Sequence, residues 1–331
     1  MFIEFVLVAL AIFLLTVVLE KLIIPILISH KVGQKILEIG PRWHASKAGT
    51  PTMGGICFIM SILVVMTVAS VTIAIAGKTR MLIPLALSLG LATLNGLIGF
   101  FDDYTKLVKK QNEGFTPKQK IALQSLVAII YLVAMGLTNN INTALHIPFT
   151  SVSLELGAFY YVFAFVLIIG FVNSVNLTDG IDGLASSVTL VVGIFFSVVA
   201  FVHDMKMLAF VGACLIGATA GFLVYNFYPA RVFMGDTGSL FLGGLVVGAT
   251  FMLDEPMIIF LVGIIYLIEA ASDIIQVGVF KLSGRKIRVF KMAPIHHHFE
   301  KCGWSEVKIV IVFSIVTLIG CAVCVAAVKM A

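Results

Sequence analysis

Aspartates gather in three short segments of this sequence. Asp102 and Asp103 stand in GFFDDYTK, Asp179 and Asp182 in NSVNLTDGIDGL, and Asp236 in NFYPARVFMGDTGSL. Carboxylates accompanied by lysine and arginine suit a magnesium-bound phosphate compound, because Mg²⁺ prefers hard oxygen ligands. Transfer of a phosphoryl group requires such a metal, cationic side chains and a positioned nucleophile. The three segments therefore predict a site that handles phosphate.

Two further motifs fit this chemistry. GDTGS (235–239) opens a predicted helix, where glycines let the backbone approach a ligand and free N–H groups bind phosphate. APIHHHFE (293–300) carries His296, His297 and His298. Consecutive side chains point in different directions on a helix or strand, so three in a row do not converge easily on one metal. We expect hydrogen bonds to an anionic substrate there, in preference to a zinc site.

The elements that carry these residues are predicted membrane helices. Of the 331 residues, 60% are hydrophobic and 12% charged, and the mean hydropathy is +1.11. This composition excludes an ordinary soluble domain, and long apolar runs without period-2 alternation favour spanning helices over a β-barrel. The sequence predicts an all-α integral membrane protein with a single polytopic domain over 1–331. Its ten predicted helices are 2–28, 53–76, 81–101, 119–138, 158–176, 184–202, 207–227, 238–253, 257–281 and 306–328.

Basic residues are distributed unevenly between the two sets of loops. One set, with the adjoining helix ends, holds 18 of the 22 lysines and arginines. The positive-inside rule makes this face cytoplasmic and, with an even number of helices, puts both termini outside. The aspartate segments and the histidines share this face, so we expect the active site there. The 18 residues are Lys21, Lys31, Lys35, Arg42, Lys47, Lys106, Lys109, Lys110, Lys118, Lys120, Arg231, Lys281, Arg285, Lys286, Arg288, Lys291, Lys301 and Lys308.

The motifs quoted above resemble the signature segments of the polyprenyl-phosphate N-acetylhexosamine-1-phosphate transferases. Within that superfamily, KAGTPTMGG (47–55) and the histidine loop resemble the bacterial MraY branch, the phospho-N-acetylmuramoyl-pentapeptide transferases. The similarity spans nearly the whole chain, and the family's fold has the same ten-helix plan.

The resemblance implies a reaction and its partners. UDP-N-acetylmuramoyl-pentapeptide gives its phospho-sugar to undecaprenyl phosphate, which releases UMP and forms lipid I with Mg²⁺ as cofactor. The implied location is the bacterial plasma membrane, where the enzyme is multi-pass and active on the cytoplasmic face. The implied partners are these two substrates and the lipid bilayer, with no nucleic acid, and a homodimer remains open.

Roles carry over only to residues in matching motifs. The resemblance implies that Asp236 is the magnesium ligand and that Asp102 and Asp103 form a catalytic pair beside it. Phe233 is implied to stack on uracil. The implied substrate-binding residues around the nucleoside and diphosphate are Lys47, Thr52, Asn176, Asp179, Gly180, Asn226, Gly235 and Ser239, and the implied phosphate-side cations are Lys106 and Lys118. Those implied near the sugar or peptide end are Gln276, His296, His297 and His298.

Several alternatives stay open at this point. Asp182 is expected to order its loop, while Asp179 contacts substrate. Direct attack by the lipid phosphate is favoured over a covalent aspartyl intermediate, and the separate roles of Asp102 and Asp103 are not assigned. One rival function is a sibling transferase that uses UDP-N-acetylglucosamine. Another is a secondary transporter, although transporters place polar groups near the midplane and these cluster at one interface.

Overall fold

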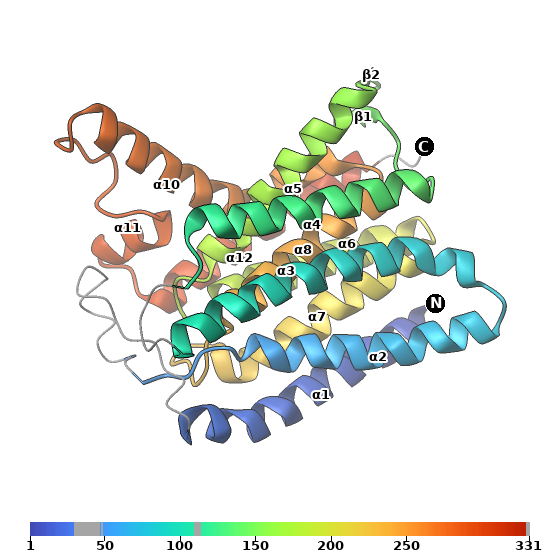
Figure 1. Ribbon diagram of the computed structural model, residues 1–331, viewed down its shortest axis with the longest axis horizontal. Helices are drawn as coiled ribbons and strands as arrows, with labels where there is room; N and C mark the ends of the chain where they lie inside the picture. Colours follow the sequence, from blue (N-terminus) through green and yellow to red (C-terminus); the bar gives the residue numbers. More distant parts are fainter. Residues whose placement is uncertain (30–46, 48, 109–113, 329–331) are drawn as a thin grey trace.

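The protein, described here by a computed structural model for residues 1–29, 47, 49–108 and 114–328, is built almost entirely from helices (Figure 1). They are α1 (Phe2–Ser29), α2 (Gly55–Ile75), η2 (Thr79–Leu82), α3 (Ile83–Val108), α4 (Pro117–Leu137), α5 (Ala158–Thr178), α6 (Leu184–Val202), α7 (Lys206–Asn226), α8 (Gly235–Met252), η3 (Pro256–Ile258), α9 (Ile259–Val262), α10 (Ile264–Leu282), α11 (Ile295–Lys301) and α12 (Glu306–Ala327). A small antiparallel hairpin of β1 (Ala144–His146) and β2 (Ser153–Glu155) joins α4 to α5.

Many of these helices are suited to a membrane. Within the described residues, eight helices are long and apolar enough to cross a bilayer, and the number is nine if the bent pair η3–α9 and α10 forms one span. α8 is not among them because it opens with the polar and small residues GDTGS, which lower its average hydropathy. The prediction of an all-α integral membrane protein is confirmed.

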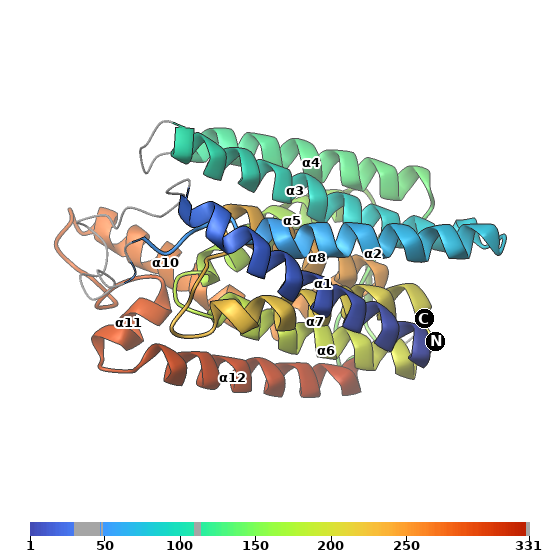
Figure 2. The same ribbon diagram turned by 90° about the horizontal axis from the view of Figure 1, so that it is seen from below.

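α8 occupies the centre of the bundle (Figures 1 and 2). Sixteen of its eighteen residues are buried. Glycines allow its neighbours to approach closely, since a Cβ added at Gly244 would lie 2.7 Å from the Cα atom of Ala92 in α3. Small residues at helix contacts have this role in membrane bundles, where van der Waals packing holds the helices together. The position of α8 fixes its first turn between the ends of α3 and α5.

The predicted helix over 257–281 is broken in the structure. The chain there forms a 3₁₀ turn and the short α9, followed by α10, with a bend of 80° between the two parts. Gly263 stands at the break, where an added Cβ would lie 2.8 Å from the Ile259 carbonyl oxygen and 2.9 Å from the ring of Phe171. The bend lets α10 lean away from the bundle (Figure 1).

The two ends of the bundle differ in their contents. α1 begins and α12 ends at one end, while α11 lies at the opposite end (Figures 1 and 2). The three aspartate segments lie at the end where α3 and α5 finish and α8 begins. Some basic residues used to predict the sidedness of the protein lie outside the described residues: Lys31, Lys35, Arg42, Lys109 and Lys110.

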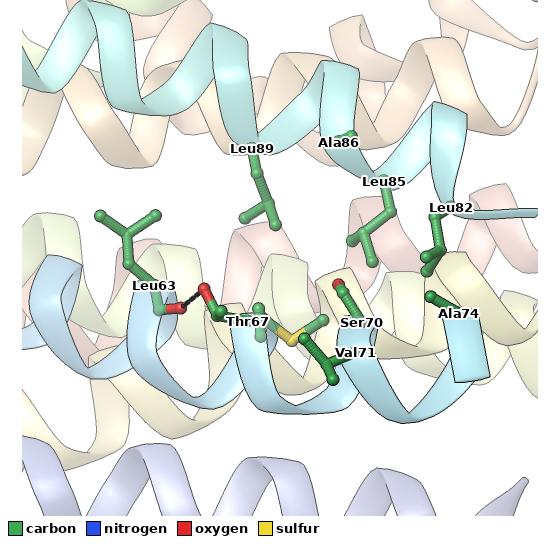
Figure 3. Close-up of a pocket in the computed structure, with 10 residues that line it drawn as sticks. Leu63, Thr67, Ser70, Val71, Ala74, Leu82, Leu85, Ala86 and Leu89 are labelled. Atoms are coloured by element: carbon green, nitrogen blue, oxygen red, sulfur yellow. Dashed lines mark hydrogen bonds between the residues drawn. The ribbon is translucent and has the colours of Figure 1, made fainter. Parts of the chain in front are cut away.

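An apolar cavity of about 380 Å³ lies between α2 and α3 (Figure 3). Its lining contains no charged side chain, and the hydroxyl of Thr67 donates to the Leu63 carbonyl oxygen at 2.7 Å. This cavity therefore lacks the groups that phosphate chemistry needs. The lining residues are Leu63, Met66, Thr67, Ser70, Val71, Ala74, Leu82, Leu85, Ala86 and Leu89.

The close approach of α3 to α8 can be tested at Gly99. A Cβ at this position would overlap the carbonyl group of Asp236 in the first turn of α8. We expect Gly99→Ala to lower the free energy of unfolding by about 1–3 kcal/mol, as overpacking does elsewhere. Gly90→Ala is the matched control in the same helix, because an added Cβ there meets no atom within 4 Å. Thermal unfolding in detergent compares the two; equal melting temperatures would contradict the tight contact.

Candidate active site

Three carboxylates meet where α3 ends and α8 begins. Asp102 and Asp103 lie in the penultimate turn of α3, and Asp236 lies in the first turn of α8. One oxygen from each lies within 4.8 Å of the others. Asp102 and Asp103 are buried, and Asp236 is partly exposed. Carboxylates this close repel one another, so the arrangement requires positive charge beside it.

Two lysines supply that charge. Lys106 Nζ lies 2.7 Å from Asp102 Oδ2, 3.4 Å from Asp103 Oδ1 and 3.0 Å from Asp236 Oδ2. Lys120 Nζ, from the first turn of α4, lies 2.7 Å from Asp236 Oδ2. The family resemblance implies Lys118, not Lys120, as the second phosphate-side cation, but Lys118 is exposed. The direction in which α4 begins, which motif matching does not reveal, decides which lysine faces the carboxylates.

Backbone donors hold the two α3 carboxylates in place. Asp103 Oδ2 accepts from the Thr237 amide at 3.0 Å and from the Thr237 hydroxyl at 2.8 Å. The Thr237 amide is one of the free N–H groups at the start of α8, where a negative charge is favoured. Asp102 Oδ1 accepts from the Phe115 amide at 2.6 Å, just before α4. Thr237 was not anticipated from the sequence.

Asn176 and Gly235 complete the centre. The side-chain amide of Asn176 donates from Nδ2 to Asp236 Oδ1 and to the Ser239 hydroxyl, both at 2.8 Å. Gly235 has a φ of +69°, and an added Cβ would lie 2.5 Å from Asp103 Oδ2 and 3.0 Å from the Thr52 hydroxyl. Its left-handed backbone and lack of space both require glycine. Asn176, Gly235, Ser239 and Thr52 are thus brought together with the carboxylates.

Asp182 belongs to a second network at the same end of the molecule. Asp182 Oδ1 lies 2.6 Å from Lys47 Nζ, and the same Nζ lies 2.6 Å from Glu306 Oε2. Asp182 Oδ2 accepts from the Ala230 amide at 2.8 Å. Glu306 Oε2 in turn accepts from the Asp182 amide. The network ties the ends of four distant segments together, so both Lys47 and Asp182 have structural partners.

Asp179 differs from Asp182 in its surroundings. It follows α5 directly and is half-buried. Loss of hydration on burial, followed by repulsion from the carboxylates of Asp236 and Asp103, raises the pKa of Asp179 well above its ordinary value. The higher pKa favours the neutral carboxyl, which can donate a hydrogen bond.

Phe233 and Asn226 border the loop that leads into α8. The Phe233 amide donates to the Pro51 carbonyl oxygen at 2.8 Å, and its own carbonyl accepts from the Gly54 amide at 2.9 Å. Phe233 is half-buried. The side-chain amide of Asn226 instead forms hydrogen bonds within the protein. Its Oδ1 accepts from the Ser186 hydroxyl at 3.1 Å, and its Nδ2 donates to the Val232 carbonyl oxygen at 2.9 Å.

The three histidines have separate partners. His296 is fully buried, and its Nδ1 lies 3.0 Å from Glu269 Oε2 of α10. His296 Nε2 faces Gly180, where an added Cβ would overlap it. His297 Nδ1 lies 2.6 Å from Glu300 Oε2. Nδ1 of the third, His298, accepts from the Lys291 amide at 3.1 Å.

The histidines therefore do not form a metal site among the described residues, where the grouping with metal-ligand spacing is that of Asp102, Asp103 and Asp236. Gln276 is committed to the backbone: its side chain accepts from the Val289 and Phe290 amides and donates to the Phe290 carbonyl oxygen, each at 3.0 Å. Its side chain orders the loop after α10.

The fold and the carboxylate–lysine centre define a class of membrane-embedded transferase. Residues 84–254, which span α3 to α8, match the family model described as glycosyl transferase family 4. Residues 47–59 match phospho-N-acetylmuramoyl-pentapeptide-transferase signature 1.

Relatives that align with nearly the whole chain identify the family within this class. A phospho-N-acetylmuramoyl-pentapeptide-transferase of Staphylococcus aureus (strain bovine RF122 / ET3-1) is 43% identical over 314 residues, which cover 94% of this chain and 95% of the relative. One of Clostridium botulinum (strain Alaska E43 / Type E3) is 46% identical over 309 residues, which cover 93% and 92%. The chain belongs to the phospho-N-acetylmuramoyl-pentapeptide-transferase family.

The network around Asp182 yields a stability prediction. Asp182→Asn removes the charge that Lys47 contacts in a buried setting, and such losses cost about 1–3 kcal/mol. We expect a lower melting temperature in detergent. Asp204→Asn is the matched control, because Asp204 is exposed and its φ of +53° is tolerated by asparagine. An unchanged melting temperature for Asp182→Asn would show that the network contributes little.

Proposed function

We propose that this protein transfers phospho-N-acetylmuramoyl-pentapeptide from its UDP carrier to undecaprenyl phosphate, forming lipid I and UMP. The observation that carries the proposal is the group of three carboxylates and two lysines at one end of an apolar helix bundle, in a chain of this family. Both substrates are anionic, and the lysines provide the charge that attracts them.

Different residues of the site contact different parts of the substrates. Phe233, which is half-buried in the loop that leads into α8, stacks on uracil. Lys106 and Lys120 contact the phosphate oxygens on which charge develops during transfer, which is where fixed cations accelerate such reactions most. Asn176 and Ser239 position Asp236 through their shared hydrogen bonds.

Mg²⁺ is the proposed cofactor. The donor set fits it, because three carboxylates with oxygens within 4.8 Å of one another are hard ligands and Asp236 is partly exposed. When bound, the metal would stabilise negative charge on the diphosphate. Asp236 would be its principal ligand, with Asp102 and Asp103 beside it.

We propose direct attack by the lipid phosphate oxygen on the sugar-bearing phosphorus, with UMP as the leaving group. Asp102 is held by Lys106 and the Phe115 amide, and Asp103 by Thr237. A covalent aspartyl intermediate would require one of these carboxylates to leave its partners. Their engagement supports a role in orienting lysines and metal.

We also propose the membrane arrangement expected from the sequence. Counting α8, and η3–α9 with α10 as one span, gives ten spans in a single catalytic domain with both termini outside. The site would face the cytoplasm across the bacterial plasma membrane. The basic loops at the end that holds the aspartates support this orientation.

The reaction is tested by UMP release from purified protein in detergent with undecaprenyl phosphate. We expect release with UDP-N-acetylmuramoyl-pentapeptide, and loss of release when EDTA removes divalent metal. UDP-N-acetylglucosamine is the comparison donor. Turnover of that donor alone would overturn the proposal in favour of the sibling transferase. Solute transport without UMP release would favour a transporter.

Asp236→Ala is expected to reduce UMP release at least about 100-fold, the usual effect of losing one strong electrostatic contact to a transition state. The protein should stay folded, because Asp236 lies at a partly exposed helix start. Asp204→Ala, at an exposed turn between α6 and α7, should retain activity. Near-normal turnover by Asp236→Ala would refute the metal assignment.

Lys120 and Lys118 provide a matched pair. Lys120→Gln removes the amine 2.7 Å from Asp236 and is expected to lower kcat roughly 10- to 100-fold. Lys118→Gln changes an exposed lysine two residues away and should have a far smaller effect. The measurement is kcat for UMP release from each variant; the opposite ranking would restore the assignment made from the sequence.

A further inference from the structure

The end of α10 and the loop after it form a basic surface outside the carboxylate centre. We call this surface the basic tip, and all of its residues are exposed: Lys281, Arg285, Lys286, Arg288 and Lys291. The sequence contains no acidic residue between Asp273 and Glu300. The tip therefore concentrates positive charge without any negative charge of its own.

Within the part of the chain that the structure describes, none of the cations of the basic tip forms an ion pair with a carboxylate. The Arg288 guanidinium lies over the Phe280 ring at 5.4 Å, and Lys291 Nζ donates to the Lys301 carbonyl oxygen at 3.3 Å. The surface is thus available to an anionic partner.

Large aliphatic side chains alternate with these cations. Leu282 is 90% exposed, Ile287 59% and Val289 49%. They continue an apolar face of α10 that includes Ile274, which is 71% exposed. A surface that combines exposed aliphatic groups with lysine and arginine matches the boundary between acyl chains and headgroups.

The position of α10 agrees with this match. After the 80° bend the helix leans away from the bundle, and its C-terminal end projects at the end that holds α11 (Figure 1). The basic tip therefore lies outside the helix bundle and not against its core.

We propose that the basic tip binds the anionic headgroups of membrane phospholipids, with Leu282, Ile287 and Val289 inserted between the acyl chains. Charge complementarity selects an anionic lipid, and the alternating aliphatic groups select a bilayer over a free phosphate compound. Each basic residue near an anionic membrane surface strengthens association about fivefold.

The bound lipid would also restrain α10 and the residues that this helix positions. Gln276 of α10 holds the backbone of Val289 and Phe290 in the tip, and Glu269 of the same helix holds His296. Lipid at the tip thereby fixes the helix that positions His296 against Gly180.

The test measures lipid association directly, without donor or polyprenyl phosphate, so it does not depend on the proposed transferase reaction. Native mass spectrometry compares the phosphatidylglycerol and phosphatidylcholine retained by the full-length protein in detergent. We expect wild type to prefer phosphatidylglycerol. The triple variant Arg285→Gln, Lys286→Gln, Arg288→Gln should lose at least about tenfold of that preference.

Two controls isolate the basic tip. Arg285→Lys with Arg288→Lys keeps the charge and should keep the preference. Lys78→Gln with Arg80→Gln removes an exposed basic pair before α3, where the tip is not involved, and should also keep it. Melting temperatures establish that each variant is folded.

Any of four outcomes overturns the proposal. Wild type shows no preference for phosphatidylglycerol, the triple glutamine variant keeps the preference, or the Lys78 and Arg80 variant loses it equally. Displacement of the lipid by millimolar UMP would also overturn it, by assigning the tip to nucleotide phosphate.

Discussion

The site depends on holding three carboxylates together at the end of an apolar bundle. Asp102, Asp103 and Asp236 present oxygens within 4.8 Å of one another, which repulsion and lost hydration both oppose. Lys106 and Lys120 offset the charge, and the Thr237 amide at the start of α8 supplies a further donor. The ends of α3, α4 and α8 must therefore meet at one point, and the glycines along α3 and α8 permit this approach.

A second polar network at the same end has a different character. Lys47 lies between Asp182 and Glu306, so its charge is satisfied within the protein. The carboxylate–lysine centre instead includes the partly exposed Asp236, where a ligand can exchange with the internal contacts. One network joins distant segments, and the other keeps charged groups accessible. Because the two networks are separate, Asp179 and Asp182 have different surroundings although they stand in the same short segment.

Several residues implied to bind substrate show what motif matching does not reveal. Gln276, Asn226 and Lys47 lie in matching segments, yet each side chain is engaged by the protein itself. Glu269 stands outside the motifs quoted above, and its contact with His296 joins α10 to α11. A motif records which residue types occur in a segment, while the partner of each side chain depends on segments far away in the sequence.

The sequence alone determined the class of the fold, because composition and the length of apolar runs decide whether helices can lie in lipid. It also determined the family and the three aspartates of the centre, since these stand in long motifs. Only the tertiary structure decided that Lys120 faces Asp236, that α10 bends at Gly263 and that Asp182 binds Lys47. These features arise from contacts between α3, α4, α8 and α10 and from the space available at each contact, which no local pattern encodes.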